Sequence, residues 1–236
     1  MSDALYDRIA GIYDPWSASV REDVEFYVEE ALGSGGPVVE LAVGTGRIAV
    51  PIAMAGLEVI GVDQSPEMLA VARGYAEREG VENLVDLRVG DLREPPVAER
   101  VPLVTIPFRS LLHMPDDEQR GRALRAAARL LEPGGRLVFD VFAPSNEDIE
   151  ETDGLWLERE RGIFERADWD ARARTLVRSV RSDDQAATMH LRWLSPPEWN
   201  ALLEEAGFAV EALYGWFDRR AWDGGEDQIW VCRRPG

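Results

Sequence analysis

The stretch VVELAVGTGRIAVPIA, residues 38–53, decides the fold. Its apolar start ends at Glu40, small residues follow, and apolar residues then return at a spacing typical of a helix. A strand that turns into a helix through glycines lets the backbone approach a ligand closely. The run from Gly44 to Ala49 fits the dinucleotide fingerprint G-x-G-x-x-G/A, but other adenosine-containing ligands use a similar turn. The glycine turn therefore predicts a nucleoside ligand and leaves its identity open.

Strand and helix patterns alternate on both sides of this turn. Residues 1–33 are predicted to be helical, with Val24, Tyr27, Val28 and Ala31 repeating at helical spacing. Further strands are expected over 37–42, 57–63, 84–91, 101–108 and 136–142, and helices over 46–55, 65–79 and 116–135. This alternation predicts a parallel sheet covered on both faces.

The pattern changes after residue 150. Residues 155–195 contain three stretches of roughly alternating polarity, separated by turns at 168–171 and 182–185, which predict an inserted antiparallel meander. A helix over 197–208 and strands at about 208–217 and 227–234 follow. We therefore expect one domain, residues 1–236: a helical cap (1–36), an α/β core (37–144), an inserted antiparallel sheet (about 150–195) and the end of the core (196–236).

Composition narrows the function. The 236 residues carry a formal net charge of −18, and every basic residue apart from two histidines is arginine. This negative charge disfavours a nucleic-acid substrate. Cys232 is the single cysteine, which excludes a disulfide framework and a cysteine-rich metal site, so no metal is expected. No membrane span or signal-peptide core is visible, and we expect a cytoplasmic protein.

The predicted carboxyl ends of the strands gather the candidate ligand-binding residues, because ligands of parallel sheets bind there. Gly44 and Gly46 let the backbone approach. Asp63, at the end of the second strand of the core, can accept both hydroxyls of an adenosine ribose. These features suit NAD and S-adenosylmethionine equally.

Two further acidic residues separate these ligands. Asp91 ends the third strand, where its carboxylate can accept from the adenine amine while Leu92 packs on the ring. The dinucleotide fingerprint has no place for this acid. Glu40, just before the glycines, suits a ligand with ammonium and sulfonium groups better than a pyrophosphate. Both observations favour S-adenosylmethionine.

At this point the chain resembles the class I S-adenosylmethionine-dependent methyltransferases over nearly its whole length. ELAVGTG is similar to the first motif of that family, GVDQSPEML to its second, and VGDLRE to its adenine motif. IPFRSLLHMPDDEQR and LLEPGGRLVFDVF resemble its fourth and fifth strand blocks. YDRIAGIYD is similar to the N-terminal segment of members that act on small molecules, including sugar N-methyltransferases. Ala42 departs from the family by replacing the first glycine of the motif.

The resemblance implies a Rossmann-like sheet of seven strands, mostly parallel, with the last strand antiparallel. It also implies that S-adenosyl-L-methionine is the cofactor. The cofactor-binding residues that it implies are Tyr13, Glu40, Ala42, Gly44, Gly46, Asp63, Gln64, Met68, Asp91, Leu92, Pro107 and Phe108.

Catalytic groups are less clearly indicated. His113 and Tyr13 are the candidates, although His113 also suits a packing role that orients its loop, and His190 is a weaker one. Arg109 follows Phe108 where many relatives carry a small polar residue. It favours an anionic substrate or holds the cofactor carboxylate if it faces the pocket, and has neither role if it faces solvent.

The predicted function is methyl transfer to nitrogen or oxygen of a small-molecule acceptor. Transfer from a sulfonium needs alignment more than a base, so an uncertain base does not argue against it. The alternatives are a nicotinamide-dependent oxidoreductase, for which no Tyr-x-x-x-Lys pair exists, and a non-catalytic S-adenosylmethionine-binding module. Neither a nucleic-acid nor a membrane partner is expected, and a homodimer is left open.

Overall fold

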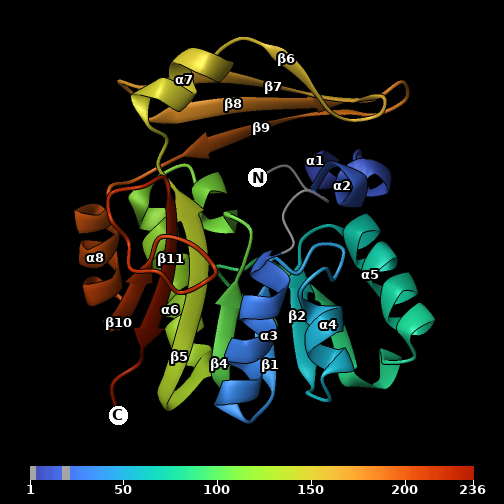
Figure 1. Ribbon diagram of the computed structural model, residues 1–236. Helices are drawn as coiled ribbons and strands as arrows, with labels where there is room; N and C mark the ends of the chain where they lie inside the picture. The colour runs from blue at the N-terminus through green and yellow to red at the C-terminus, as the bar shows by residue number, and fades with distance from the viewer. Residues whose placement is uncertain (1–3, 18–21) are drawn as a thin grey trace.

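The computed structural model describes residues 4–17 and 22–236 and contains a seven-stranded sheet in the order β10-β11-β5-β4-β1-β2-β3 (Figure 1). The core strands are β1 (Val38–Leu41), β2 (Val59–Asp63), β3 (Val85–Val89), β4 (Val101–Ile106), β5 (Leu131–Phe142), β10 (Ala209–Tyr214) and β11 (Asp227–Arg233). The last strand, β11, is antiparallel to both neighbours, while β1 to β5 pair in parallel. The predicted fold class is confirmed.

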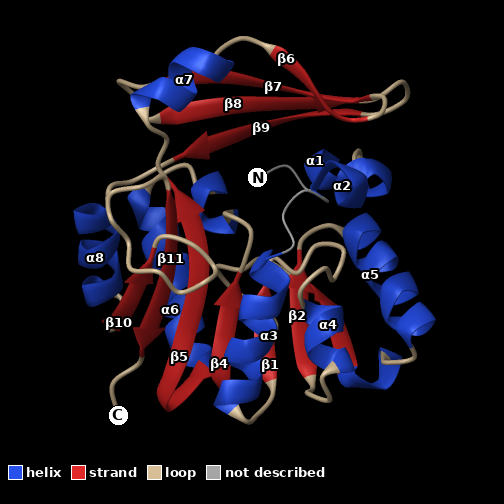
Figure 2. Ribbon diagram, in the orientation of Figure 1, coloured by secondary structure: helices blue, strands red, loops and turns tan. Residues whose placement is uncertain are grey.

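Helices cover both faces of this sheet (Figure 2). One face packs against α3 (Glu22–Ser34), α4 (Ala49–Met54) and α5 (Pro66–Glu79), and the other against α6 (Asp117–Leu130) and α8 (Pro196–Glu205). Successive strand residues point to opposite faces. In β1, Val38 accordingly joins the cluster with α3 to α5, and Val39 the cluster with α6 and α8.

Local signals place some helix ends well and others poorly. Ser65 caps α5 by accepting from the Met68 N–H, and Asp116 caps α6, as the sequence predicts. The helix expected from residue 46 begins only at Ala49, because Gly46 has a φ of +78°, which no right-handed helix accommodates. The helix expected to run to residue 135 ends at Leu130, where β5 begins and pairs with β4.

A second sheet follows β5 through α7 (Asn146–Thr152). It is a four-stranded antiparallel meander of β6 (Trp156–Glu160), β7 (Ile163–Asp170), β8 (Thr175–Arg181) and β9 (Ala186–Arg192). The prediction of three stretches was wrong by one strand, because Gly162, with a φ of +78°, makes a hairpin turn inside the first of them. The meander lies across the carboxyl end of the main sheet (Figure 1), where Trp169 packs edge-on against Phe142.

The N-terminal helices α1 (Ala4–Asp7) and α2 (Ala10–Ser17) lie between the meander and α5 (Figure 1). Two short 3-10 turns, η1 (Glu82–Leu84) and η2 (Ser110–His113), complete the elements. None of the helices in residues 4–17 and 22–236 is long and apolar enough to cross a membrane. The cytoplasmic location, the oligomeric state and the division into parts stay predictions.

Candidate functional site

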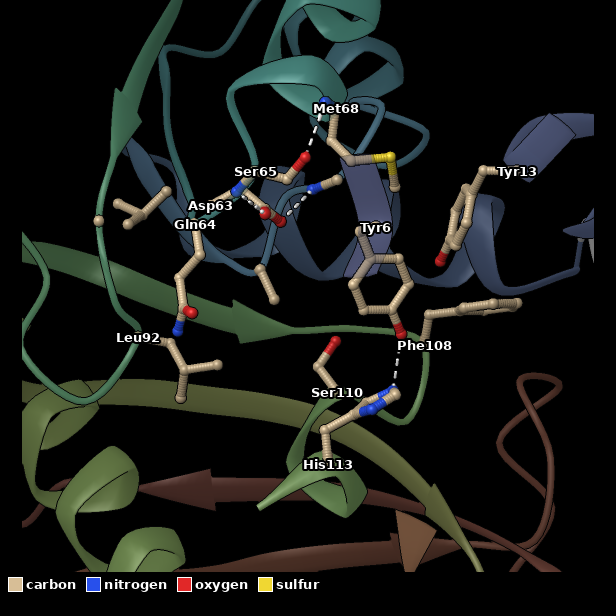
Figure 3. A pocket seen from close by; sticks show the side chains of 14 residues that line it. Tyr6, Tyr13, Asp63, Gln64, Ser65, Met68, Leu92, Phe108, Ser110 and His113 are labelled. Carbon is tan, nitrogen blue, oxygen red and sulfur yellow. Dashed lines mark hydrogen bonds between the residues drawn. The ribbon is translucent and has the colours of Figure 1, made fainter. Parts of the chain in front are cut away.

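A pocket opens at the carboxyl ends of β1, β2 and β4, beneath α1 and α2 (Figure 3). It is lined by Tyr6, Tyr13, Ala42, Gly44, Val62, Asp63, Gln64, Ser65, Met68, Gly90, Leu92, Phe108, Ser110 and His113. We call this the donor pocket. The sequence places eight of these residues in its cofactor-binding set, namely Tyr13, Ala42, Gly44, Asp63, Gln64, Met68, Leu92 and Phe108.

Asp63 is fixed at the end of β2 by backbone groups. Its Oδ2 accepts from the Gly44 N–H at 2.9 Å, and its Oδ1 accepts from the Ser65 N–H at 2.9 Å. Burial raises the pKa of Asp63, and these backbone hydrogen bonds oppose that rise. Each carboxyl oxygen keeps a second lone pair, so the group can also accept from the hydroxyls of a ligand.

The two glycines of the turn, Gly44 and Gly46, have different roles. Gly44, with a φ of +56°, lines the donor pocket, and a Cβ there would stand 3.6 Å from the Met68 Sδ-methyl carbon. Gly46 instead lies against α5, where a Cβ would meet the Ala72 Cβ at 3.2 Å. Ala42 lines the pocket at a φ of +61°, a left-handed conformation that explains why glycine suits this position.

Glu40 lies in β1 and is 2% exposed, outside the pocket lining. Its Oε2 is buried with no hydrogen-bond partner among the described residues. Burial raises the pKa of Glu40 well above its ordinary value, and Arg47 opposes that shift. A buried acceptor without a donor is costly. A ligand ammonium in this region would supply that donor.

Asp91 and Pro107 also lie outside the pocket lining. Asp91 is bound by Arg93 through both the side chain and the backbone N–H, the latter at 2.8 Å. Burial acts to raise the pKa of Asp91, and the Arg93 contacts outweigh it, so the net shift is downward. Leu92 lines the pocket beside it, with Gly90, which the sequence did not indicate. The adenine role of Asp91 stays a prediction.

Tyr6 and His113 close the pocket from opposite sides. The Tyr6 hydroxyl lies 2.8 Å from the His113 Nε2, and Tyr13 packs edge-on against both Tyr6 and Phe108 (Figure 3). Burial, helped by the positive charge of Arg178, lowers the pKa of His113 to about 4. Burial raises the pKa of Tyr6 and Tyr13. Near neutral pH the imidazole is therefore uncharged and both phenols keep their protons.

These pKa values indicate whether the candidate residues can act as a general base. A histidine with a pKa near 4 is a weak proton acceptor, so the structure favours a positioning role for His113. His190 lies on β9 with an exposed side chain and lines none of the cavities described here. Among the described residues, no cluster of three or more histidines, cysteines or acids is arranged to hold a metal ion.

A second cavity adjoins the donor pocket at Phe108, which lines both. It lies between the main sheet and the meander and is lined by Trp16, Asp23, Phe108, Arg109, Asp140, Arg159, Glu165, Arg178, Trp216, Phe217 and Asp227. We call it the acceptor cavity. Arg109 therefore faces a cavity, donates to Asp227 at 3.0 Å and stacks over Phe142.

Asp140, two residues before the end of β5, fixes the turn of Phe108, which lines both cavities. Its Oδ1 accepts from the Phe108 N–H and the Tyr27 hydroxyl, both at 2.7 Å, and its Oδ2 accepts from the Arg109 N–H at 3.1 Å. Phe108 and Arg109 have positive φ angles of 55° and 62°, and these hydrogen bonds stabilise that turn. Burial raises the pKa of Asp140 to about 6. Asp140 was not predicted from the sequence, although it follows an apolar run near the end of β5.

A pocket at the carboxyl ends of parallel strands, in a sheet whose antiparallel last strand lies beside β5, defines the class I methyltransferase architecture. The comparisons with known proteins agree. Residues 38–135 match the family model of a methyltransferase domain.

Individual methyltransferases, known from their sequences or structures, are also similar to this chain. Methyltransferase GfsG from Streptomyces halstedii is 32% identical over 123 residues, which cover 52% of this chain and 43% of that protein. The structure of the CcbJ methyltransferase from Streptomyces caelestis is 28% identical, with a TM-score of 0.86 and coverage of 100% of both chains. CalS10, an amino pentose methyltransferase from Micromonospora echinaspora solved with S-adenosylmethionine, shares the fold at 20% identity, a TM-score of 0.65 and coverage of 90% of both chains.

Residues 38–135 are thus similar to methyltransferase domains, and the fold of the chain is that of the class I S-adenosylmethionine-dependent methyltransferases. The chain spans only part of the curated relatives that it matches, with 43%, 57% and 64% of the lengths of three of them covered.

Proposed function

We propose that this chain transfers the methyl group of S-adenosyl-L-methionine to a nitrogen or oxygen atom of a small-molecule acceptor. The observation that carries the proposal is the pair of cavities that meet at Phe108. One holds the carboxylate of Asp63 at the end of β2, as an adenosine site requires, and the other is covered by the meander and can admit an acceptor.

The residues of the donor pocket fit S-adenosylmethionine. Asp63 would accept from the ribose hydroxyls, while Met68 and Leu92 would pack against the adenosine. The unpartnered Glu40 Oε2 would accept from the ammonium group. When bound, this cofactor supplies an activated methyl group on a sulfonium.

The protein's own contribution to the reaction is alignment. Methyl transfer is an in-line displacement, so holding donor and acceptor in register supplies most of the acceleration. Phe108, fixed by Asp140, forms the boundary at which the two reactants would meet. The neutral His113 and protonated Tyr6 hold the wall of the donor pocket rather than remove a proton. An amine acceptor attacks as the free base and needs no protein base.

The test is a donor-binding panel followed by an acceptor screen. We expect S-adenosylmethionine and S-adenosylhomocysteine to raise the melting temperature, and NAD and NADP to leave it unchanged. Incubation with methyl-labelled donor and an acceptor library of small amines and alcohols should then give labelled products by mass spectrometry. Stabilisation by NAD or NADP alone would contradict the proposal. Donor binding without transfer to any acceptor would support the non-catalytic module instead.

A further inference from the structure

Three arginines converge on the acceptor cavity. Arg109 follows β4, Arg159 lies in β6 and Arg178 lies in β8, and all three line the acceptor cavity together with Glu165 of β7. The same four residues also line an adjoining cavity that extends toward α7. We call Arg109, Arg159 and Arg178 the arginine cluster. Because the chain has a net charge of −18, three arginines at one cavity are unexpected and need a physical explanation.

The protein itself does not satisfy the whole cluster. Arg109 is paired with Asp227 at 3.0 Å, and Arg159 with Glu165 at 2.9 Å. Arg178 has no hydrogen-bond partner among the described residues, and its Nε is buried and lies 3.9 Å from the Glu165 Oε2. Its side chain is only 17% exposed. A buried N–H such as that of the Arg178 Nε is unfavourable without an acceptor, and a ligand in the cavity would supply one.

Glu165 cannot fully balance the cluster. Its Oε2 already accepts from the Trp16 indole N–H at 2.8 Å, and its Oε1 accepts from Arg159. Burial lowers the pKa of Arg178; Glu165 opposes this, whereas the like charges of Arg109 and Arg159 add to it. An anion placed among these three guanidinium groups would relieve both the repulsion and the missing hydrogen bonds.

The other acidic residues around the acceptor cavity leave the Arg178 donors unused, because each of them has its own hydrogen-bond or ion-pair partners. Asp140 accepts three hydrogen bonds, and Asp23 is paired with Arg47 at 2.5 Å. Near α7, burial and the neighbouring Asp148 raise the pKa of Glu226 to about 7, so this carboxyl is about half protonated at pH 7. The unused donors lie on the arginine side.

We propose that the arginine cluster binds an anionic group, a carboxylate or a phosphate, carried by the methyl acceptor. This inference rests on the proposed function. None of the three arginines lines the donor pocket, so the anion belongs to the acceptor rather than to the methyl donor. Arg178 acts as the specificity-determining residue, and Arg109 and Arg159 increase the local positive potential.

The experiment uses the whole 236-residue chain saturated with S-adenosylhomocysteine. Benzoate, its uncharged analogue benzamide, and inorganic phosphate are titrated at constant ionic strength, and binding is followed by ligand-observed NMR and the melting temperature. We expect binding of benzoate or phosphate and none of benzamide. Comparison of the two anions tells a carboxylate site from a phosphate site.

Variants assign the binding to the cluster. Arg178→Met should weaken anion binding about tenfold or more, since it removes a charge-assisted contact. Arg181→Met is the matched control, because Arg181 is exposed on the same strand and lies outside both cavities. Glu165→Gln keeps an acceptor for Trp16, removes the competing charge and should strengthen anion binding.

The outcomes separate this inference from the proposed function. Failure of S-adenosylhomocysteine to bind would contradict the proposed function itself. If S-adenosylhomocysteine binds but neither anion does, the anion site alone is wrong. Anion binding that Arg178→Met leaves unchanged would also overturn it, as would a Glu165→Gln variant that loses stability without gaining anion affinity, since Arg178 would then serve only as a structural ion pair.

Discussion

At the scale of single residues, Asp63 is the side chain on which donor binding depends most directly. Both carboxyl oxygens already accept one backbone N–H, from Gly44 and Ser65, which aims the remaining lone pairs at the pocket. We predict that Asp63→Asn weakens S-adenosylmethionine binding about ten- to a hundredfold, because it removes charged hydrogen bonds to the ribose. Isothermal titration calorimetry measures the change.

The control for Asp63→Asn is Asp86→Asn. Asp86 lies on β3, is exposed and is bound by Arg88, away from the donor pocket. Its substitution should leave donor affinity unaltered. Equal affinities of Asp63→Asn and the natural chain, both still folded by circular dichroism, would refute the ribose assignment.

From the lowered pKa of His113 we predict how the free energy of unfolding depends on pH. Its pKa falls from an ordinary 6.5 to about 4 in the folded protein, so between these values the unfolded chain binds more protons. Stability is therefore lost as the pH falls. Between pH 7 and pH 5 this group removes about 2 kcal/mol of unfolding free energy. Asp140 acts in the opposite sense, because its raised pKa makes stability fall as the pH rises toward 6.

The difference between two variants isolates the histidine. His113→Gln keeps an acceptor for the Tyr6 hydroxyl but does not titrate, so its urea-unfolding free energy should fall less between pH 7 and pH 5 than that of the natural chain. His190→Gln, at an exposed site, should behave like the natural chain. If His113→Gln lost as much stability as the natural chain, the buried neutral imidazole would be disproved.

At the scale of elements, the N-terminal helices are attached to the core by a few polar contacts. Asp14 of α2 accepts from the Thr45 hydroxyl at 2.5 Å, and Asp7 of α1 accepts from the Ser65 hydroxyl. Tyr6 contacts both His113 and the Met189 sulfur of the meander. Helices α1 and α2 form the lid of the donor pocket. These contacts join the lid to the glycine turn, to the β2–α5 loop and to both sheets.

We predict that Tyr6→Phe weakens S-adenosylhomocysteine binding about fivefold, since loss of one hydrogen bond costs about 1 kcal/mol. The Phe ring keeps the packing against Tyr13, so the melting temperature should change little. Tyr75→Phe on α5, outside the pocket, provides the matched control. An unchanged affinity would show that the hydroxyl does not hold the lid in its binding position.

Elements whose limits depend on neighbouring residues could be predicted from the sequence. The Ser65-Pro66 start of α5 and the Asp116 cap of α6 are such cases, because capping is a contact over three residues. The start of α4 could not, since it depends on the left-handed conformation of Gly46, which the spacing of apolar residues does not indicate. The turn at Gly162 was missed because alternating polarity continues through it.

The same distinction applies to the candidate site. Asp63 and Phe108 were predicted because strand ends of a parallel sheet share one edge. Arg178 was not, because it acquires its role only when the meander folds back over that edge. Asp140 was not predicted either, because its partners Tyr27, Phe108 and Arg109 are distant in the sequence. No local pattern indicates that the charged residues of the meander turn inward, since each lies among apolar residues of the same strand face. Glu165 shares its face with Ile163 and Ala167, and Arg178 shares its face with Leu176 and Val180.

At the scale of the whole molecule, the net charge of −18 sets how stability depends on salt. Like charges spread over a folded surface repel one another, and salt screens that repulsion. Salt also weakens exposed ion pairs such as Arg88–Glu99, but such pairs contribute little to stability. The repulsion therefore dominates, and we predict that the melting temperature rises by several degrees as sodium chloride is raised from low to physiological and higher concentration.

A charge variant tests the cause of this rise. Replacement of the exposed Glu132, Glu150 and Glu151 by glutamine removes three negative charges without touching either cavity. The variant should melt higher than the natural chain at low salt and gain less from added salt, so the two curves converge. Donor affinity should depend little on salt, because Asp63 acts through short hydrogen bonds in a buried pocket. Parallel melting curves at all salt concentrations would mean that ion exclusion from the surface, rather than screened repulsion, stabilises the protein.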